Sequence, residues 1–372
     1  MSNDIMKQDN IKETRIIHSL ITFGTLVAVM AVAIIIYEVD PHVPMFVGVI
    51  AASGMAMYLG YSWEQIEKSM MEGIYRALQS IMILAIIGIL IGVWIVGGIV
   101  PAMIYYGLKL LTPGMFLVAT VLICSITSLA TGSSWGTMGT MGLALMGVAH
   151  GLGIPAGVAG GAIISGAYFG DKVSPLSDTT NLAPAMAGTD VFTHIKFMMQ
   201  STAVTYAITL IFFGGLSYHY SSGASVVDMS QVTEMSDGLA KSFNINPLLL
   251  LPPIIVIISM ALKVPAIPGI TAGIIIGAIF GMIFQGDHCT LGSVMGCGMS
   301  GYESQIGIKS LDKLLSAGGL KNMMNSISLT IIAMMFGGIM EKTKQLEVIV
   351  KAFMSITDRK STRLNSSHLE LS

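Results

Sequence analysis

Two polar clusters suited to binding a small cation lie in the middle of an apolar chain. The first is the run TGSSWGTMGTMG from Thr131, which supplies Ser133, Ser134 and Thr137. The second cluster follows Gly170, and its candidate ligands are Asp171, Ser174, Ser177, Asp178, Thr179, Thr180 and Asn181. Carboxylates, hydroxyls and backbone carbonyls are the oxygen ligands that hard cations prefer in proteins. Both clusters therefore predict an ion site.

The second cluster brings charge next to membrane sequence. Residues 110–169 contain no Asp, Glu, Lys or Arg, so part of this run should lie at membrane depth. An ionisable side chain in or beside a span costs roughly 2.5 to 3.5 kcal/mol on insertion scales and by default marks a functional site. Asp178 is the first candidate for the functional carboxylate, although it could instead cap a helix that starts at Thr179. Asp171 could pair with Lys172 or gate the site.

The glycines around these clusters have two interpretations. Those of the first cluster, Gly132, Gly136, Gly139 and Gly142, would let a helix unwind and expose carbonyl groups. Three pairs also have the GxxxG spacing that is typical of close helix packing, namely Gly132 with Gly136, Gly157 with Gly161, and Gly166 with Gly170. For the glycines alone packing is favoured, whereas the adjacent hydroxyls joined to the second cluster favour ion coordination.

Residues 132–136 also match the G-x-S-x-G pattern of a hydrolase nucleophile. That pattern needs a strand before it and a helix after it, and the sequence around it is uncharged membrane sequence without such alternation. We therefore expect no enzyme and no cofactor. A structural or receptor-like membrane protein, whose polar breaks only line a ligand pocket, is a third alternative.

Composition predicts an all-α, polytopic membrane protein. Hydrophobic residues make up 53% of the 372 residues and charged residues 11%, against about 25% charged in soluble domains. The net charge of −2 gives no indication of nucleic acid as a partner. Cys124, Cys289 and Cys297 form no CxxC pair, so we expect reduced packing residues rather than a disulfide or metal framework.

Apolar runs predict around nine crossings or half-crossings. They lie at about 16–37, 43–59, 81–100, more than once within 115–169, and at 197–217, 245–262, 264–285 and 322–340. Residues 218–244 are expected to be the main hydrophilic loop, a solvated external connection. Basic residues before the first span, together with Lys68 and Arg76 in the expected loop after the second, favour a cytoplasmic N-terminus.

An internal repeat is visible at an offset of 246 residues. It places 73–92 over 319–338 and matches Gly73 with Gly319 and Gly92 with Gly338. Chance similarity between two apolar helices is the alternative. Transporters built from repeats bind their substrate at broken helices near the repeat interface, so the repeat predicts a repeat-built transporter.

The same offset predicts the organisation of the whole chain. The counterpart of 132–178 would lie at 378–424, so we expect the second repeat to be incomplete. We expect the polar run 358–372 to be non-native rather than a genuine short C-terminus. The predicted parts are a cytoplasmic segment 1–15, a transporter domain 16–357 and the tail 358–372.

The runs GTMGTMG and GAYFGDKVSPLSDTTNLAPAMAGTDVFTHI resemble the NhaC family of sodium/proton antiporters. The resemblance extends from about Ile16 to Met354 and is most specific from Gly161 to Ile195. It implies exchange of Na+ against H+ across the cytoplasmic membrane of a prokaryote. Related members exchange organic acids such as malate and lactate together with these ions, and this is the alternative function.

The resemblance also carries over the candidate site. Its central motif matches Asp171, Ser174, Ser177, Asp178, Thr179, Thr180 and Asn181, and its earlier motif matches Ser133, Ser134 and Thr137. The implied partners are Na+, H+ and the lipid bilayer, with a homo-oligomer as an open alternative and no nucleic acid. Burial favours the neutral form of a carboxylate and a bound cation favours its charged form, so Na+ and H+ would compete for the same group.

Overall fold

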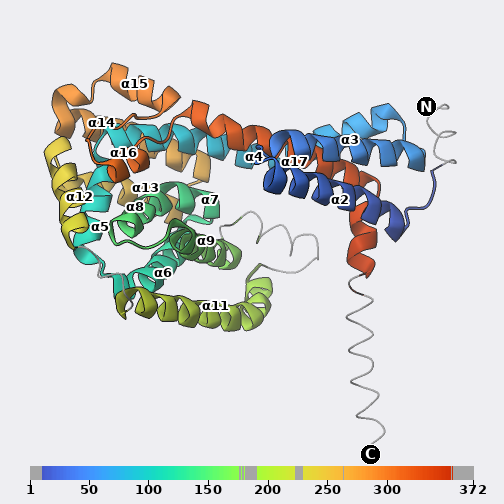
Figure 1. Cartoon of the computed structure of the whole chain (residues 1–372), viewed down its shortest axis with the longest axis horizontal. Helices are drawn as coiled ribbons and strands as arrows, with labels where there is room; N and C mark the ends of the chain where they lie inside the picture. Colours follow the sequence, from blue (N-terminus) through green and yellow to red (C-terminus); the bar gives the residue numbers. More distant parts are fainter. Residues whose placement is uncertain are drawn as a thin grey trace, which may run out of the picture. The chain divides into compact units, whose positions relative to one another are not determined.

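The computed structural model describes residues 11–175, 177, 180, 191–222, 229–262, 264–352 and 354. Every regular element in this part of the chain is a helix (Figure 1). Six helices are long and apolar enough to cross a membrane, or seven if one bent pair counts as a span. The all-α, polytopic prediction is confirmed, whereas the predicted tail 358–372 lies outside the described residues.

The chain divides into two compact units, which are described separately. The first comprises Met1–Ile81 and Asn325–Ser372, and the second comprises Met82–Met324. Two long helices, α4 (Trp63–Val96) and α17 (Leu320–Lys342), contribute residues to both.

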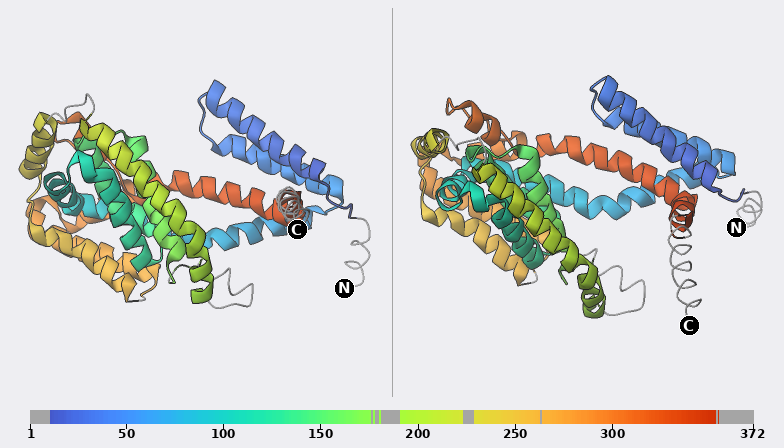
Figure 2. Two further views of the ribbon diagram at one scale, coloured as in Figure 1. Left: turned by 90° about the horizontal axis from the view of Figure 1, so that it is seen from below. Right: turned by 60° about the horizontal axis from the view of Figure 1, so that its bottom comes forward.

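The first unit is built on a helical hairpin at its N-terminal end. Its helices are α2 (Ile16–Ala31), continued by the π-helical η2 (Val32–Ile36), and α3 (His42–Leu59). They lie side by side in both views of Figure 2. Leu26 and Val49 of this hairpin belong to a small apolar cluster with Ile66 of α4 and Ile339 of α17. The two predicted spans at 16–37 and 43–59 are confirmed.

The predicted loop between the second and third spans is wrong, because α4 already begins at Trp63. Its charged residues stand four apart, as Glu64 with Lys68 and Glu72 with Arg76, a spacing that supports a helix. They occupy an exposed face, while residues such as Ile66 are buried. Lys68 and Arg76 therefore lie on a helix and not in a loop, and the cytoplasmic N-terminus remains a prediction.

The second unit contains the helices that position both polar clusters. In chain order they are α5 (Ile99–Leu110), α6 (Pro113–Thr131), α7 (Ser134–Thr137), the π-helical η3 (Met138–Gly142), α8 (Leu143–Gly151), α9 (Ala156–Val173), α11 (Val191–Ser222), α12 (Met229–Ser242), the 3-10 helix η4 (Pro247–Leu250), α13 (Leu251–Ala261), α14 (Ala266–Gln285), the 3-10 helix η5 (Gly286–His288), α15 (Leu291–Ser300) and α16 (Lys309–Leu315). The uncharged run 115–169 thus lies in α6, in the continuous stretch formed by α7, η3 and α8, and in α9.

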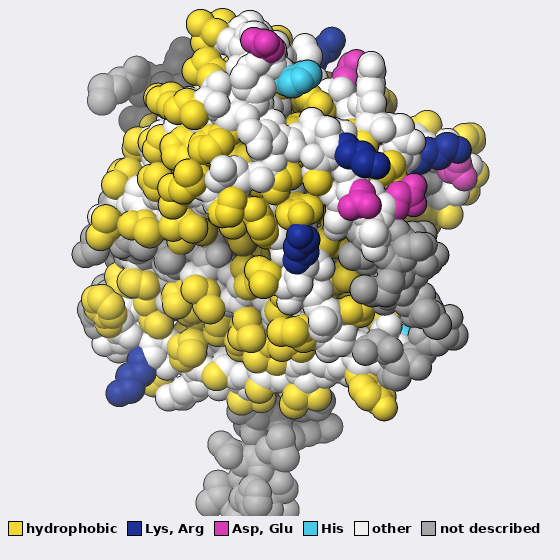
Figure 3. All heavy atoms as spheres, turned by 90° about the vertical axis from the view of Figure 1, so that its left-hand side faces the viewer, with side chains coloured by type: hydrophobic (Ala, Val, Ile, Leu, Met, Phe, Trp, Pro, Cys, Tyr) yellow, Lys and Arg dark blue, Asp and Glu magenta, His cyan; other side chains and the backbone are white. Residues whose placement is uncertain are grey.

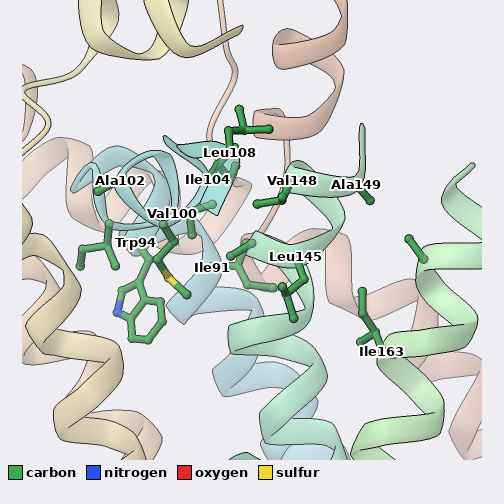
Figure 4. Packing of buried hydrophobic residues seen from close by; sticks show 14 of the residues in the cluster. Ile91, Trp94, Val100, Ala102, Ile104, Leu108, Leu145, Val148, Ala149 and Ile163 are labelled. Carbon is green, nitrogen blue, oxygen red and sulfur yellow. The ribbon is translucent and has the colours of Figure 1, made fainter. Parts of the chain in front are cut away.

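Buried apolar side chains hold this second unit together. Trp94 is almost fully buried, and its indole N–H donates to the carbonyl of Gly273 at 3.0 Å. Ile104 of α5 and Val148 of α8 belong to the same cluster, which continues to Ile163 of α9 (Figure 4). Because α8 and α9 are fixed in this core, it also fixes the ends of the helices that carry the polar clusters.

The predicted hydrophilic loop 218–244 is also wrong as a loop. Helix α11 continues to Ser222, and α12 occupies Met229–Ser242. Met235, Leu239 and Phe243 are buried at a spacing of four, which places them on one helix face. The average polarity of this segment conceals an apolar stripe that packs on the core.

Many apolar side chains point outward, as expected for a protein that lies in a membrane. On α14, Ile275, Ile279 and Ile283 are exposed at a spacing of four. Hydrophobic side chains cover much of the face drawn in Figure 3, with few charged groups among them. Such a large exposed apolar surface indicates a partner or a membrane, and the apolar length of the spanning helices indicates lipid.

Two helix ends are equivalent at the offset that the repeat predicts. Helix α4 ends at Val96 and α17 ends at Lys342, 246 residues later. The second residue after each end is left-handed, with φ of 75° at Gly98 and 57° at Lys344. The beginnings differ, because Gly73 lies inside α4 whereas its counterpart Gly319 precedes α17 with φ of 83°.

Candidate functional site

Small residues bring α6 and α9 into close parallel contact. A Cβ atom on Gly166 would lie 2.4 Å from the carbonyl oxygen of Val121, and one on Gly170 would lie 2.3 Å from that of Ser125. Both pairs are 45 residues apart in the sequence, so the two helices run in the same direction in a fixed register (Figures 1 and 2). The packing interpretation of Gly166 and Gly170 is confirmed.

The other glycine pairs behave differently. A Cβ atom on Gly157 would meet no atom within 4 Å among the described residues, so close packing is wrong there. Gly132 is left-handed, with φ of 65°, and ends α6. A residue with a Cβ atom would be strained in that conformation. Its role is thus to turn the chain out of the helix.

The first polar cluster forms a broken helix, as the sequence predicts. After Gly132 the backbone of Ser133 is extended, and its hydroxyl oxygen accepts from the N–H of Gly136 at 3.0 Å. Helix α7 then runs for one turn into the π-helical turn η3. Thr137 is buried and donates to the carbonyl of Ser133 at 3.0 Å. π-Helical turns inside helices are frequent at functional sites.

Asp171 joins the two clusters. It lies in the last turn of α9, and its Oδ2 accepts a hydrogen bond from the hydroxyl of Ser134 at 2.8 Å. Ser134 is almost fully buried. Within the described part of the chain, Asp171 makes this contact and no ion pair with Lys172. The alternative in which Asp171 pairs with Lys172 is therefore not seen there, and a gating role for Asp171 stays a prediction.

The remaining hydroxyls of the second cluster gather at the end of α9. Ser174 donates to the carbonyl of Leu129 at 2.8 Å, which continues the 45-residue register. The Thr180 hydroxyl lies 3.1 and 3.0 Å from the carbonyls of Asp171 and Lys172. Ser174, Ser177 and Thr180 are all buried. Asp178, Thr179 and Asn181 lie outside the described residues.

Sequence reasoning missed the hydroxyls on α6. Ser128 donates to the carbonyl of Ala167 at 2.6 Å, and Ser125 accepts from the Tyr206 hydroxyl at 2.8 Å. Together with Val121 they stand at the spacing of one helix face. That periodicity was the available signal, but small polar residues are common in apolar helices and gave no reason to single them out.

The electrostatics of this region favour a cation. Because α6 and α9 are parallel and in register, their C-terminal ends meet at Leu129 and Ser174. Each helix C-terminus carries roughly half a negative charge from its aligned peptide dipoles. The ligands on offer are hydroxyls, carbonyls and the carboxylate of Asp171, and no described group of three His, Cys, Asp or Glu side chains could hold a metal ion. Such oxygen ligands suit hard cations rather than transition metals.

A cavity of about 560 Å³ lies beside this site, between α9 and α11. The Phe169 and Tyr206 rings, both in its wall, stack with their centroids 3.6 Å apart. Asp171 also lines the cavity, next to Lys172 and His194. The carboxylate that Ser134 contacts is therefore accessible from this side.

The hydrolase interpretation finds no support in this geometry. Helix α6, not a strand, precedes residues 132–136, and no strand occurs in the described part of the chain. Ser134, which would be the nucleophile, donates to Asp171 rather than to a histidine.

Broken helices with a carboxylate at the break, in a polytopic helical protein, define a membrane transporter. The sequence model of the Na+/H+ antiporter family matches residues 166–364. The malate-2H+/Na+-lactate antiporter of Bacillus subtilis is 38% identical over 334 residues, which cover 90% of this chain and 70% of that protein. The Na+/H+ antiporter NhaC of Alkalihalophilus pseudofirmus is 35% identical over 95% of this chain and 74% of its own length. No solved structure matches the chain.

The chain therefore belongs to the Na+/H+ antiporter family, as its resemblance to NhaC sequences predicts. NhaC of Bacillus subtilis is a further relative, 36% identical over 89% of this chain and 73% of its own length. These relatives are transporters, and the match includes both the end of α9 and the second polar cluster.

Proposed function

We propose that this protein exchanges Na+ for H+ across the cytoplasmic membrane of a prokaryotic cell and that it is not an enzyme. The observation that carries the proposal is the contact of Ser134 with Asp171 where α6 and α9 end together. The names of the NhaC relatives support the two ions. The basic N-terminal segment supports a cytoplasmic N-terminus.

The exchange follows from competition at a carboxylate. The Ser134 hydroxyl donates to Asp171. When Na+ binds, the hydroxyl turns its oxygen lone pair to the ion, and the carboxylate oxygen becomes a ligand. Protonation of the carboxylate removes its charge and weakens Na+ binding. Asp178 remains the first candidate for the exchanging group, and Asp171 and the hydroxyls complete the proposed site.

Proton flux in reconstituted vesicles tests the proposal. A proton gradient should dissipate when NaCl is added and persist when choline chloride is added. Absence of flux with both Na+ and Li+, together with flux on addition of malate or lactate, would contradict Na+/H+ exchange and support the organic-acid alternative.

A further inference from the structure

A stripe of four charged side chains runs along the outer face of the first half of α4. Its members stand four residues apart, alternate in sign and are all exposed: Glu64, Lys68, Glu72 and Arg76. These four residues are called the charged stripe below. Three of them line a groove of about 500 Å³ on this face, and the other residues of the groove are Met71 and Tyr75.

The charged stripe lies beside a membrane span. On the opposite side of α4, Ile66 and Met70 are buried in the apolar cluster that includes Val49 and Ala52 of α3. Helix α3 is long and apolar enough to cross a membrane. Charged side chains that face lipid at this depth are costly, and in membrane proteins they usually pair with one another. The charges of the stripe therefore need partners.

Within the described part of the chain, one member of the stripe has such a partner. Arg76 forms an ion pair with Glu341 of α17. The four-residue spacing would also allow ion pairs along α4 itself. No ion pair of Glu64, Lys68 or Glu72 occurs among the described residues, however. Three exposed charges, two acidic and one basic, are thus left for a partner outside the chain.

The order of the signs makes the stripe complementary to itself. In a two-fold symmetric contact, residue i of one copy faces residue j of the other, and j faces i. Two α4 helices that run in opposite directions and meet at the level of Met70 place Lys68 opposite Glu72, and Glu64 opposite Arg76. Every one of these pairs joins opposite charges. Complementary charges of this kind fix the register of an interface and exclude wrong partners.

We propose that the charged stripe binds the charged stripe of a second copy of this chain and that the protein is a two-fold symmetric dimer. Lys68 and Glu72 of the two copies form the two central ion pairs. Arg76 has five N–H donors, so it contacts Glu64 of the second copy while it keeps Glu341. This inference concerns assembly and does not depend on the proposed transport function.

Two uncharged side chains complete the proposed surface. Met71 and Tyr75 lie beside the stripe and are 62% and 76% exposed. Methionine and tyrosine are enriched in protein interfaces, and both residues share the groove with Lys68 and Glu72. In the dimer they border the central ion pairs and exclude water from them, which strengthens the attraction between opposite charges.

Charge reversal tests the proposal on the purified 372-residue chain. Light scattering gives the mass of the protein in detergent and in lipid nanodiscs, and dilution gives the dissociation constant of the dimer. The parent should be a dimer. Lys68→Glu and Glu72→Lys each put like charges into both central pairs, so each should raise this constant by at least about tenfold. The double variant Lys68→Glu/Glu72→Lys restores opposite charges and should dimerise like the parent.

Glu67→Lys is the matched control. It reverses an exposed charge next to Lys68, but in the proposed pairing position 67 faces Gly73, which carries no charge. It should leave the dissociation constant unchanged. A parent that is monomeric in both detergent and nanodiscs would overturn the inference and leave lipid head groups as partners of the stripe. Single reversals that leave the dimer intact, or a double variant that stays monomeric, would overturn it as well.

Discussion

Ser134 donates a hydrogen bond to Asp171 at 2.8 Å, although 37 residues separate them in the chain. The contact depends on the packing beneath it. Gly170 has no side chain, so α9 approaches the backbone of Ser125 and Leu129 on α6. The turn at Gly132 then places the start of α7 over the end of α9. Two polar clusters thereby become one site.

The first prediction concerns the charge at this site. Asp171→Asn keeps the volume of the side chain and removes its charge, so Na+-dependent proton flux should fall by at least about tenfold, as expected when one charge-assisted contact is lost. Asp178→Asn should abolish the flux. Membrane insertion should persist in both variants. Full Na+-driven flux in Asp178→Asn would refute its role as the exchanging carboxylate.

The second prediction distinguishes the role of the Ser134 hydroxyl from that of the neighbouring Ser133 hydroxyl. Ser134→Ala removes the donor to Asp171, so the Na+ concentration for half-maximal flux should rise several-fold, up to about tenfold. Ser133→Ala instead removes an N-cap and should lower stability by about 1 kcal/mol. The checks are Na+ titrations of proton flux and melting temperatures. Equal Na+ dependence in Ser134→Ala and the parent would remove Ser134 from the site.

The third prediction tests the close packing of α6 and α9. In Gly170→Ala the new Cβ atom would stand 2.3 Å from the carbonyl oxygen of Ser125, and overpacking of this kind costs about 1 to 3 kcal/mol. Gly215→Ala on α11 is the control, because no atom of the described residues lies within 4 Å of its Cβ position. It should stabilise the helix by roughly 0.5 to 1 kcal/mol. Melting temperatures that shift in the same direction for both variants would contradict the register.

The fourth prediction concerns the pH dependence of stability that arises from Asp312, a residue outside the membrane spans. The hydroxyl of Ser304 and the N–H groups of Ile306 and Gly307 donate to Asp312 and hold the pKa of its carboxyl below its ordinary value. An acid with a lowered folded-state pKa stabilises the protein above its unfolded pKa, about 4, and loses this contribution as pH falls through the folded-state value. Asp312→Asn should therefore melt below the parent at pH 7.

Melting temperatures measured at acidic pH provide the decisive test of this prediction. The difference in melting temperature between Asp312→Asn and the parent should shrink as pH falls below about 4. A difference that is the same at pH 7 and at pH 3 would show that the loop does not depend on the charge of Asp312.

Much of the fold could be predicted because the thickness of the lipid bilayer sets the length of each membrane-spanning helix. The spans from Ile16 and at Asn322–Met340 are apolar over the length of a membrane, and helices occur there. Average hydropathy failed where a helix is polar on one side only. It assigned Lys68 to a loop and hid the buried stripe that contains Leu239. A helix-period analysis of the same residues would have found both.

The candidate site could be predicted in its members but not in its contacts. Ser134 and Asp171 were recognisable as polar residues in apolar surroundings. Their hydrogen bond depends on a register between α6 and α9 that glycines impose through space, and no local pattern gives that register.

The π-helical turn Met138–Gly142 lets the helix hold an extra residue without changing the direction of Ser134. A π turn holds more residues than an α turn, and removal of one residue would convert it to an ordinary helix with Ser134 still directed toward Asp171. Each residue advances an α-helix by about 100°. The same deletion within α8 (Leu143–Gly151) would rotate Ser134 away from Asp171 while every ligand was still encoded. The site can therefore survive a change in length at the π turn and be lost through the same change in α8.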